Sequence, residues 1–443
     1  MCYNSPAMKL TWLLRPLALA LAAGLTVAAQ QAAPPATAAP ARQSAPAAVG
    51  VSAERFQRLH QGMQRFVDRK EVSGIVTLVT RDGRTADMHA VGLQDVDSKT
   101  PMRTDTIFRI ASMTKPITSV AIMMLYEEGK LLLTDPVSKF IPGFKSMQVL
   151  EQGADKPVAA RRPISIRDLL THRSGITYGF INGGAVGNGY RKNGVVDGLS
   201  ATTLTTAEAI NKLAAEPLVA QPGSAYNYSL STDVLGRVVE VASGQPFEAF
   251  LRERIFRPLK MNDTDFVVPD AKWSRLATVY SPDGAGGIRP MRDPETFGNT
   301  VMSPIEYYKS PKTYFSGGAG LVSTAADYAR FGHMLLNGGV LDGARLLSPK
   351  TIELMTVSHT GDLGALPVAG PGRGFGLGFF VVTDLATSQT LGSVGNFGWS
   401  GIYGTTFWVD PKERLVAVMM VQRYPGSPVA AAFQPLVYQT LVK

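Results

Sequence analysis

The 443-residue sequence predicts an α/β (α+β) protein: an antiparallel sheet flanked by N- and C-terminal helices, with a mostly helical subdomain inserted into it. Three observations predict this class. An amphipathic helix and a hairpin lie near the start of the chain, helices and irregular loops fill the middle, and short strands with a closing helix end it. The two ends of the chain would therefore share one sheet.

Residues 1–29 have the pattern of a secretory signal peptide. Positive charge precedes a short apolar stretch, and the small residues at 27–29 suit a cleavage site. The apolar stretch is too short to span a membrane. We therefore expect a periplasmic or secreted protein with no stable membrane insertion after processing, and an uncleaved anchor is the alternative.

Residues 30–50 are expected to form a linker, because residues 31–50 contain nine alanines and four prolines and almost no large apolar side chain. The folded domain is expected to cover residues 51–443. Within it, the mostly helical insertion is expected at about 131–310, where the short strands give way to helices and loops.

Composition excludes several classes of function. Hydrophobic residues make up 45% and charged residues 18%, as in globular proteins. The net charge of +9 is spread thinly, so no nucleic-acid partner is expected. Cys2 is the single cysteine and the five histidines are scattered, so we expect no intrachain disulfide, no metal site and no cofactor.

The first elements of the domain follow from the spacing of apolar residues. Residues 53–69 have the period of an amphipathic helix, and residues 75–91 read as a hairpin with its turn at 81–83. A long helix, apolar on most of its circumference, is expected to begin near Ser112 and to end at 127–129.

Helix signals also mark the middle and the end of the chain. Ser165 and Ser231 are predicted to begin helices, Thr205 with Glu208 forms a capping box, and Gly244 ends the helix that starts at Ser231. Further elements are helices at 247–255, 323–336 and about 428–441, and strands at 376–382, 393–396, 402–409 and 415–421.

The stretch Ser112-Met113-Thr114-Lys115 carries the first chemical signal. Residues three apart on a helix share a face, so the Ser112 hydroxyl and the Lys115 amine can touch. A serine needs a neighbouring base to act as a nucleophile, and a lysine in an apolar surround can serve as one. The free N–H groups of a helix start also suit a developing oxyanion. The alternative is a capping serine followed by a solvated lysine.

Two further segments follow in order: Tyr228-Ser229-Leu230 before a predicted helix, and Trp399-Ser400-Gly401 entering a strand. Together with Ser112-Met113-Thr114-Lys115 they resemble the serine β-lactamase and penicillin-binding-protein superfamily. They are most similar to the class C β-lactamase-like family VIII carboxylesterases. The resemblance covers about residues 55–440 and implies a β-lactamase/transpeptidase-like fold. Supporting stretches are 169–176, Pro222-Gly223 and 317–323.

The resemblance implies a role for each motif. Ser112 would be the acylated nucleophile, and Lys115 would take its proton or keep Tyr228 as a phenolate. Tyr228 would act as general base and then as acid to the leaving group. The backbone N–H groups of Ser112 and Ile402 would form the oxyanion hole. Tyr226 is a weaker candidate for the tyrosine role, as is Tyr280, which begins a second Tyr-Ser pair.

Departures from the family pattern bear on the substrate. Leu230 stands where lactam-cleaving relatives carry an asparagine, and Trp399, Ser400 and Gly401 replace their Lys-Thr-Gly. We expect these four residues to contact the substrate and to favour small, uncharged acyl esters over peptides or penicillins. Candidate pocket residues, each of which could equally be core, are Tyr178, Phe180, Phe397 and Tyr403.

The leading interpretation is a serine hydrolase that cleaves small acyl esters through a Ser112 acyl-enzyme. A class C-like β-lactamase, a D-amino-acid-specific peptidase or an acyltransferase using the same site are the alternative enzymes, with a small-molecule ester or amide as partner. A non-catalytic binding module gains little from a buried lysine. A Ser-His-Asp hydrolase is disfavoured because the sequence has no Gly-x-Ser-x-Gly. The sequence leaves the oligomeric state open.

Overall fold

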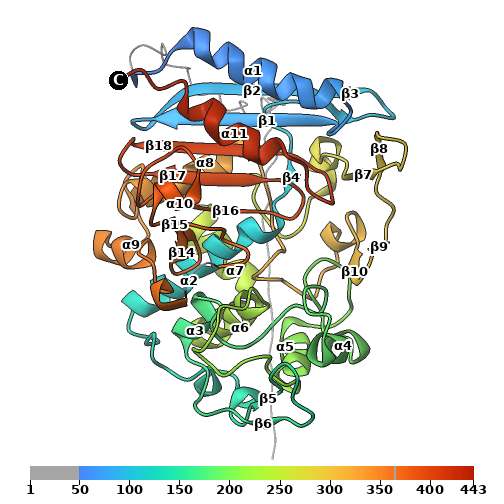
Figure 1. Ribbon diagram of the computed structural model, residues 1–443, viewed down its shortest axis with the longest axis vertical. Helices are drawn as coiled ribbons and strands as arrows, with labels where there is room; N and C mark the ends of the chain where they lie inside the picture. The colour runs from blue at the N-terminus through green and yellow to red at the C-terminus, as the bar shows by residue number, and fades with distance from the viewer. Residues whose placement is uncertain (1–48, 364–365) are drawn as a thin grey trace, which may run out of the picture. The chain divides into compact units, whose positions relative to one another are not determined.

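The computed structural model describes residues 49–363 and 366–443, so the predicted signal peptide and most of the predicted linker lie outside the described residues. An antiparallel eight-stranded sheet forms the centre of the domain (Figure 1). The strand order along this sheet is β14 (Arg373–Phe375), β15 (Phe380–Val382), β16 (Phe397–Ser400), β17 (Thr406–Asp410), β18 (Leu415–Met420), β1 (Gly74–Arg81), β2 (Arg84–Asp95) and β3 (Thr100–Pro101).

The first and last strands of the chain meet in the middle of this sheet. β1 pairs with β18 in a register that places Val76 opposite Met420 and Arg81 opposite Leu415. Both strands are buried along nearly their whole length, because helices cover the two faces. The prediction that the two ends of the chain share one sheet is therefore confirmed.

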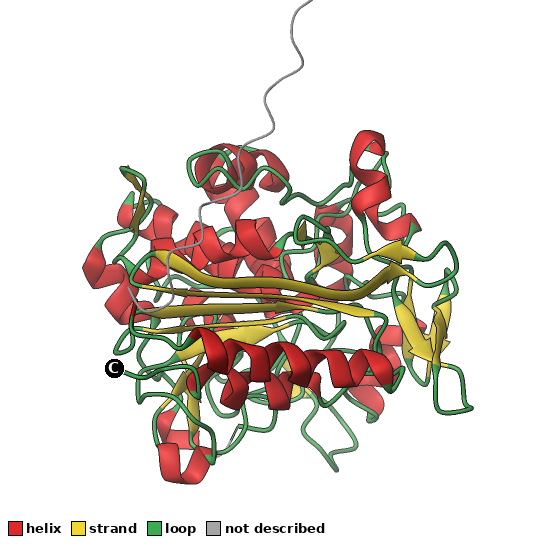
Figure 2. Ribbon diagram, turned by 90° about the horizontal axis from the view of Figure 1, so that it is seen from above, coloured by secondary structure: helices red, strands yellow, loops and turns green. Residues whose placement is uncertain are grey.

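Two helices cover one face of the sheet. They are α1 (Ala53–Asp68) and α11 (Val429–Tyr438), which lie on the same side of β1 and β18 (Figures 1 and 2). Phe56 and Met63 of α1 pack in one cluster with Phe433 of α11 and Trp408 of the sheet. The predicted N-terminal and closing helices are thus confirmed. The hairpin of β1 and β2 directly follows the first of these helices in the sequence.

The opposite face carries the larger core and the helix that begins beside Ser112. This helix, α2 (Thr114–Glu127), is buried on every side from its first residue to Leu125. α8 (Ala325–Leu336) packs on the sheet against β18, β1 and β17. The near-uniform apolar sequence of the long helix predicted this burial.

The middle of the chain forms the lower part of the molecule in Figure 1. The capping boxes at Ser165 and Thr205 are present. The helix predicted to be capped by Ser231 begins there, but its N-cap is Leu230, which has no side-chain cap, so the capping role of Ser231 was wrong. The helices are α3 (Ile166–Leu170), α4 (Ala185–Lys192), α5 (Thr206–Ala214), α6 (Ser231–Ser243) and α7 (Phe247–Leu251), which continues as a π-helical turn over Arg252–Phe256.

Small two-stranded sheets and short helices complete the domain. They are β4 (Phe108–Arg109) with β11 (Val322–Ser323), β5 (Gln148–Val149) with β6 (Val158–Ala159), β7 (Tyr280–Pro282) with β8 (Ile288–Pro290), β9 (Glu295–Phe297) with β10 (Thr300–Met302), β12 (Val340–Leu341) with β13 (Ala344–Arg345), α9 (Pro349–Met355) and α10 (Leu385–Ser388). Among the described residues, no helix is both long and apolar enough to cross a membrane.

The C-terminal strands differ from prediction at three places. The predicted strand 376–382 contains instead the turn of the β14–β15 hairpin, in which Gly378 has φ 100°, followed by β15, which begins at Phe380. Residues 393–396 precede β16 rather than form a strand. The predicted strand 402–409 begins only at Thr406, because residues 401–404 form a turn closed by Gly404 N–H donating to the Gly401 carbonyl.

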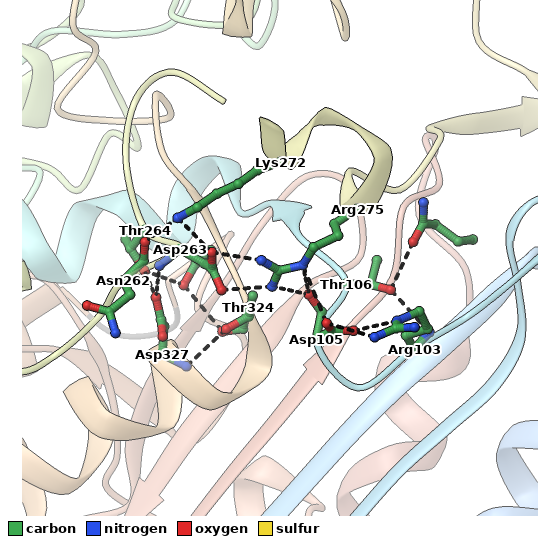
Figure 3. A network of polar contacts seen from close by, with 12 residues as sticks. Arg103, Asp105, Thr106, Asn262, Asp263, Thr264, Lys272, Arg275, Thr324 and Asp327 are labelled. Atoms are coloured by element: carbon green, nitrogen blue, oxygen red, sulfur yellow. Dashed lines mark hydrogen bonds and ion pairs between the residues drawn. The ribbon is translucent and has the colours of Figure 1, made fainter. Parts of the chain in front are cut away.

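A polar network holds the loop that leads into β4 (Figure 3). The Arg275 guanidinium lies 2.7 Å from the Asp263 carboxylate and donates to the backbone carbonyl of Asp105 at 3.0 Å. Asp327, in the first turn of α8, accepts hydrogen bonds from the Asp263 N–H at 2.7 Å and from the Thr264 hydroxyl at 3.0 Å. The loop that contains Asp105 is thereby held by Arg275, which is connected through Asp263 to Asp327 in α8.

Candidate active site

Ser112 lies in a sharp turn between β4 and α2. The chain forms a 3-10 turn over Ala111–Met113, and the α-helix begins at Thr114, two residues later than predicted. Ala111 is buried with φ 41°, a left-handed conformation that costs free energy for a residue with a Cβ. The Ser112 side chain projects from this turn and lines a cavity.

The ammonium group of Lys115 lies next to Ser112 in the core. The side chain is 1% exposed, and its Nζ is within donating distance of three oxygen atoms. These are Ser112 Oγ at 3.2 Å, Tyr178 Oη at 3.0 Å and the carbonyl of Gly318 at 2.8 Å. A lysine ammonium has three N–H donors, so all of them find an acceptor in the protein.

The carbonyl of Gly318 reaches Lys115 because its segment packs tightly against α6. A Cβ on Gly318 would lie 2.4 Å from Asp233 Oδ2, so only glycine fits this position. Asp233 is buried and accepts hydrogen bonds from the hydroxyl groups of Tyr314, at 2.9 Å, and Ser316. Burial raises the pKa of Asp233, and the nearby Lys115 charge acts in the opposite direction.

Tyr178 is the second partner of Lys115. Its ring is 2% exposed and lies 4.8 Å from the ring centroid of Phe180. Burial, together with the neighbouring Tyr228 and Asp233, raises the pKa of Tyr178 well above its usual value, so its hydroxyl stays protonated at neutral pH. Sequence reasoning placed this tyrosine among candidate pocket residues but did not anticipate its hydrogen bond to Lys115.

The structure brings Tyr228 into the same cavity as Ser112. Lys115 Nζ lies 4.7 Å from the centroid of the Tyr228 ring, which is a cation–π distance. The indole N–H of Trp399 donates to Tyr228 Oη at 3.4 Å, and the imidazole of His172 packs 4.8 Å from the ring. The Tyr228 phenol is therefore held between Lys115 and the tryptophan of β16.

The two competing tyrosines lie elsewhere. Tyr226 packs against His172 and Phe375 and does not line the cavity, and its buried hydroxyl has no hydrogen-bond partner in the described part of the chain. Tyr280 lies in β7, where its hydroxyl accepts a hydrogen bond from the N–H of Val96 at 2.7 Å. Of the three tyrosines, only Tyr228 faces Ser112.

The end of β16 forms the opposite wall. Trp399, Ser400, Gly401 and Ile402 all line the cavity. A Cβ on Gly401 would lie 2.3 Å from the carbonyl oxygen of Ile110, so a glycine is needed for this strand end to approach the turn that carries Ser112. The sheet pairing of β16 with β17 ends at Ser400, which leaves Ile402 in the turn beside Ser112.

Leu230 does not join this group. It is 1% exposed, packs in the main hydrophobic core and is not among the cavity-lining residues, so the structure does not place this side chain where the predicted contact with substrate would need it. Phe397 and Tyr403 are likewise core residues, whereas Tyr178 and Phe180 line the cavity. The sequence motifs predicted which segments form the wall of the cavity, but they did not show which side chains face the cavity and which are buried in the core.

The cavity has a volume of about 330 Å³ and is mostly apolar. Two charged side chains in its wall, those of Asp197 and Arg373, belong to none of the sequence motifs. Burial raises the pKa of Asp197 to about 6, and burial lowers the pKa of Arg373. The remaining lining residues are Ile181, Leu199, Ala319, Val368, Ala369 and Phe380.

A family model for Beta-lactamase matches residues 59–438. The chain belongs to this family. Esterase EstB from Burkholderia gladioli is 34% identical over 391 residues, covering 86% of this chain and 94% of EstB. Protein Rv1367c from Mycobacterium tuberculosis is 38% identical over 383 residues, covering 84% of this chain and 90% of the relative.

Among solved structures, EstCE1, described as a hydrolase with promiscuous acyltransferase activity, superposes with a TM-score of 0.76 at 32% identity. The match covers 87% of this chain and 98% of EstCE1. The chain is therefore a serine hydrolase of the serine β-lactamase and penicillin-binding-protein superfamily, with the fold that the three motifs predicted.

Proposed function

We propose that this Beta-lactamase family enzyme hydrolyses small acyl esters through an acyl-enzyme formed on Ser112. The observation that carries the proposal is the 3.2 Å contact between Ser112 Oγ and Lys115 Nζ inside a mostly apolar cavity. The relationship to EstB, which is named an esterase, supports the same reaction class. The missing Lys-Thr-Gly segment, replaced by Trp399, Ser400 and Gly401, argues against penicillins as substrates.

In the proposed acylation step, Ser112 Oγ attacks the ester carbonyl carbon and forms a tetrahedral intermediate. The serine proton passes to Lys115 as a neutral amine or to Tyr228, while the other N–H groups of Lys115 keep their bonds to Tyr178 and Gly318. The backbone N–H groups of Ser112 and Ile402 would hold the oxyanion, an interaction typically worth about 3 kcal/mol per donor.

The leaving alcohol then takes a proton from Tyr228, and the carbon–oxygen bond to it breaks. Water attacks the Ser112 ester in the second half of the reaction and releases the acid, with the same groups moving the proton in reverse order.

Transfer of the acyl group to an alcohol instead of water is a second candidate reaction, favoured by the likeness to EstCE1. It needs no further residue, because deacylation requires only a nucleophile that reaches the Ser112 ester. Export to the periplasm or out of the cell is a further part of the proposal, supported by the sequence of residues 1–29.

Turnover of a chromogenic butyrate ester and of a chromogenic cephalosporin by the purified enzyme tests the proposal. We expect the ester to be cleaved with the higher kcat/KM, and Ser112→Ala to lose this activity. Faster turnover of the cephalosporin would instead favour a class C-like β-lactamase. Addition of a primary alcohol to the ester assay distinguishes hydrolysis from acyl transfer, through the yield of the new ester.

A further inference from the structure

Arg373 is a positively charged side chain in the wall of the cavity that contains Ser112. It lies in β14, opposite Val382 of β15, at the edge of the sheet beyond β16. A second cavity of about 620 Å³ lies next to the first, and Arg373, Phe380 and Ser400 line both. The guanidinium therefore stands in the wall that the two cavities share.

Within the described residues, most of the hydrogen-bonding capacity of this guanidinium is unused. A guanidinium has five N–H donors, and the Arg373 group donates to the Ala369 carbonyl at 3.3 Å. Its Nε is buried without a partner among the residues that the structure describes, and its Cζ lies over the Phe380 ring, 4.6 Å from the centroid. No carboxylate of the described residues, 49–363 and 366–443, lies within ion-pair distance of it. By contrast, Arg275 and Arg289 each pair with an acidic side chain.

An unpaired charge in a cavity wall that is partly removed from water destabilises the ligand-free protein. Removal from water disfavours the charged form, and the effect is offset when an anion with matching geometry binds. The planar fork of an arginine fits the two oxygens of a carboxylate and can donate two parallel hydrogen bonds to it. Asp197 lines the catalytic cavity but not the shared wall, and it forms no ion pair with Arg373.

We propose that Arg373 binds a carboxylate of the substrate, so that the preferred esters carry a negative charge away from the scissile bond. The inference rests on the proposed esterase function, and it revises the expectation of uncharged acyl esters. The carboxylate would sit at the shared wall, on either the acyl or the alcohol side of the ester, and an adjoining apolar part could extend over Phe380.

Two matched pairs of esters test this proposal. Mono-4-nitrophenyl adipate and its methyl ester differ by a carboxylate on the acyl side, and 4-acetoxybenzoate and its methyl ester differ on the alcohol side. After correction for uncatalysed hydrolysis, we expect wild type to prefer the charged member of at least one pair. In Arg373→Gln the charged-to-neutral ratio of kcat/KM should fall by about 10- to 100-fold, mainly through KM.

Two further variants make the result specific. Arg373→Lys should keep part of the preference, because it keeps the charge but loses the planar fork. Arg65→Gln, on the exposed face of α1, removes one positive charge far from the cavity and should leave the ratio as in wild type. The pair that responds identifies the side of the ester on which the carboxylate lies.

Two results would overturn the inference. One is a charged-to-neutral ratio of kcat/KM in Arg373→Gln that equals the wild-type ratio for both pairs. The other is a preference of wild type for the neutral ester in both pairs, and this second test does not depend on a variant that folds. Failure of the proposed function gives a different result: no ester of either pair is turned over by wild type, or turnover persists in Ser112→Ala.

Discussion

The Lys115 ammonium donates a hydrogen bond to the Tyr178 hydroxyl at 3.0 Å, a shorter separation than its 3.2 Å contact with Ser112. Two tyrosines thus flank the lysine in different ways, because Tyr178 offers its oxygen and Tyr228 offers the face of its ring. This arrangement predicts different results when each hydroxyl is removed.

Tyr178→Phe deletes one of three acceptors of Lys115 while leaving the ring in place. A hydrogen bond to a charged group contributes about 1.5–3 kcal/mol, so kcat/KM for a butyrate ester should fall by about 10- to 100-fold. Steady-state kinetics measure this change. Activity equal to that of wild type would show that the 3.0 Å contact does not organise the lysine.

Tyr228→Phe removes the proposed general base and acid, so kcat/KM should fall by about 10²- to 10⁴-fold, more than for Tyr178→Phe. Tyr226→Phe is the matched control. It removes a buried hydroxyl that has no partner within residues 49–363 and 366–443, and it should leave both activity and thermal stability close to those of wild type. A larger loss in Tyr226→Phe than in Tyr228→Phe would reverse the two assignments.

Leu230→Asn restores the asparagine of the lactam-cleaving pattern, but we expect no cephalosporin turnover from it. Leu230 is 1% exposed in the core, so an amide there would lose its hydrogen bonds to water and lower the free energy of unfolding by about 1–3 kcal/mol. Leu230→Met keeps the volume and should cost less. Calorimetric melting curves compare the two, and a gain in cephalosporin turnover by Leu230→Asn would contradict the buried placement.

Stability should depend on pH through His333. Burial lowers the pKa of His333 to about 4, below the value of about 6.5 for an unfolded chain, so the unfolded state binds the extra proton between these values. The contribution of neutral His333 to the free energy of unfolding is therefore complete above pH 6.5 and is lost as pH falls towards 4. The pKa of Asp327, raised to about 6 by burial, acts with the opposite sign over an overlapping range.

The measurement compares the free energies of unfolding of wild type and a His333 variant. Urea unfolding of wild type and His333→Gln from pH 4 to 7 isolates the histidine, because Asp327 is common to both. The wild-type free energy of unfolding should lose about 3 kcal/mol relative to the variant as pH falls through this range. Parallel pH curves for the two proteins would contradict the assignment.

Local sequence patterns predicted the fold well where a pattern reports burial or a cap. The 3.6-residue period of 53–69, the hairpin turn at 81–83 and the capping box at Thr205 each appear in the structure. Patterns failed at the C-terminal strands, where a single turn at Gly378 divides an apolar run that reads as one strand. The conformation of one glycine is set by packing around it and has no periodic signal.

The same distinction applies to the site. Ser112, Lys115, Tyr228 and Trp399 belong to short motifs, and the structure brings them together around one cavity. Asp197 and Arg373 come from a loop and a short edge strand, and only the tertiary arrangement makes them part of the wall. The orientation of Leu230 depended on the helix that follows it, which buries the side chain.

Labelling with a fluorophosphonate, followed by mass spectrometry of the labelled peptide, shows directly whether Ser112 is the nucleophile. We expect that wild type is modified on Ser112, that Ser112→Ala is not labelled, and that Lys115→Ala reacts far more slowly although its serine is intact. Label retained by Ser112→Ala, or found on a peptide that does not contain residue 112, would contradict the assignment of the nucleophile.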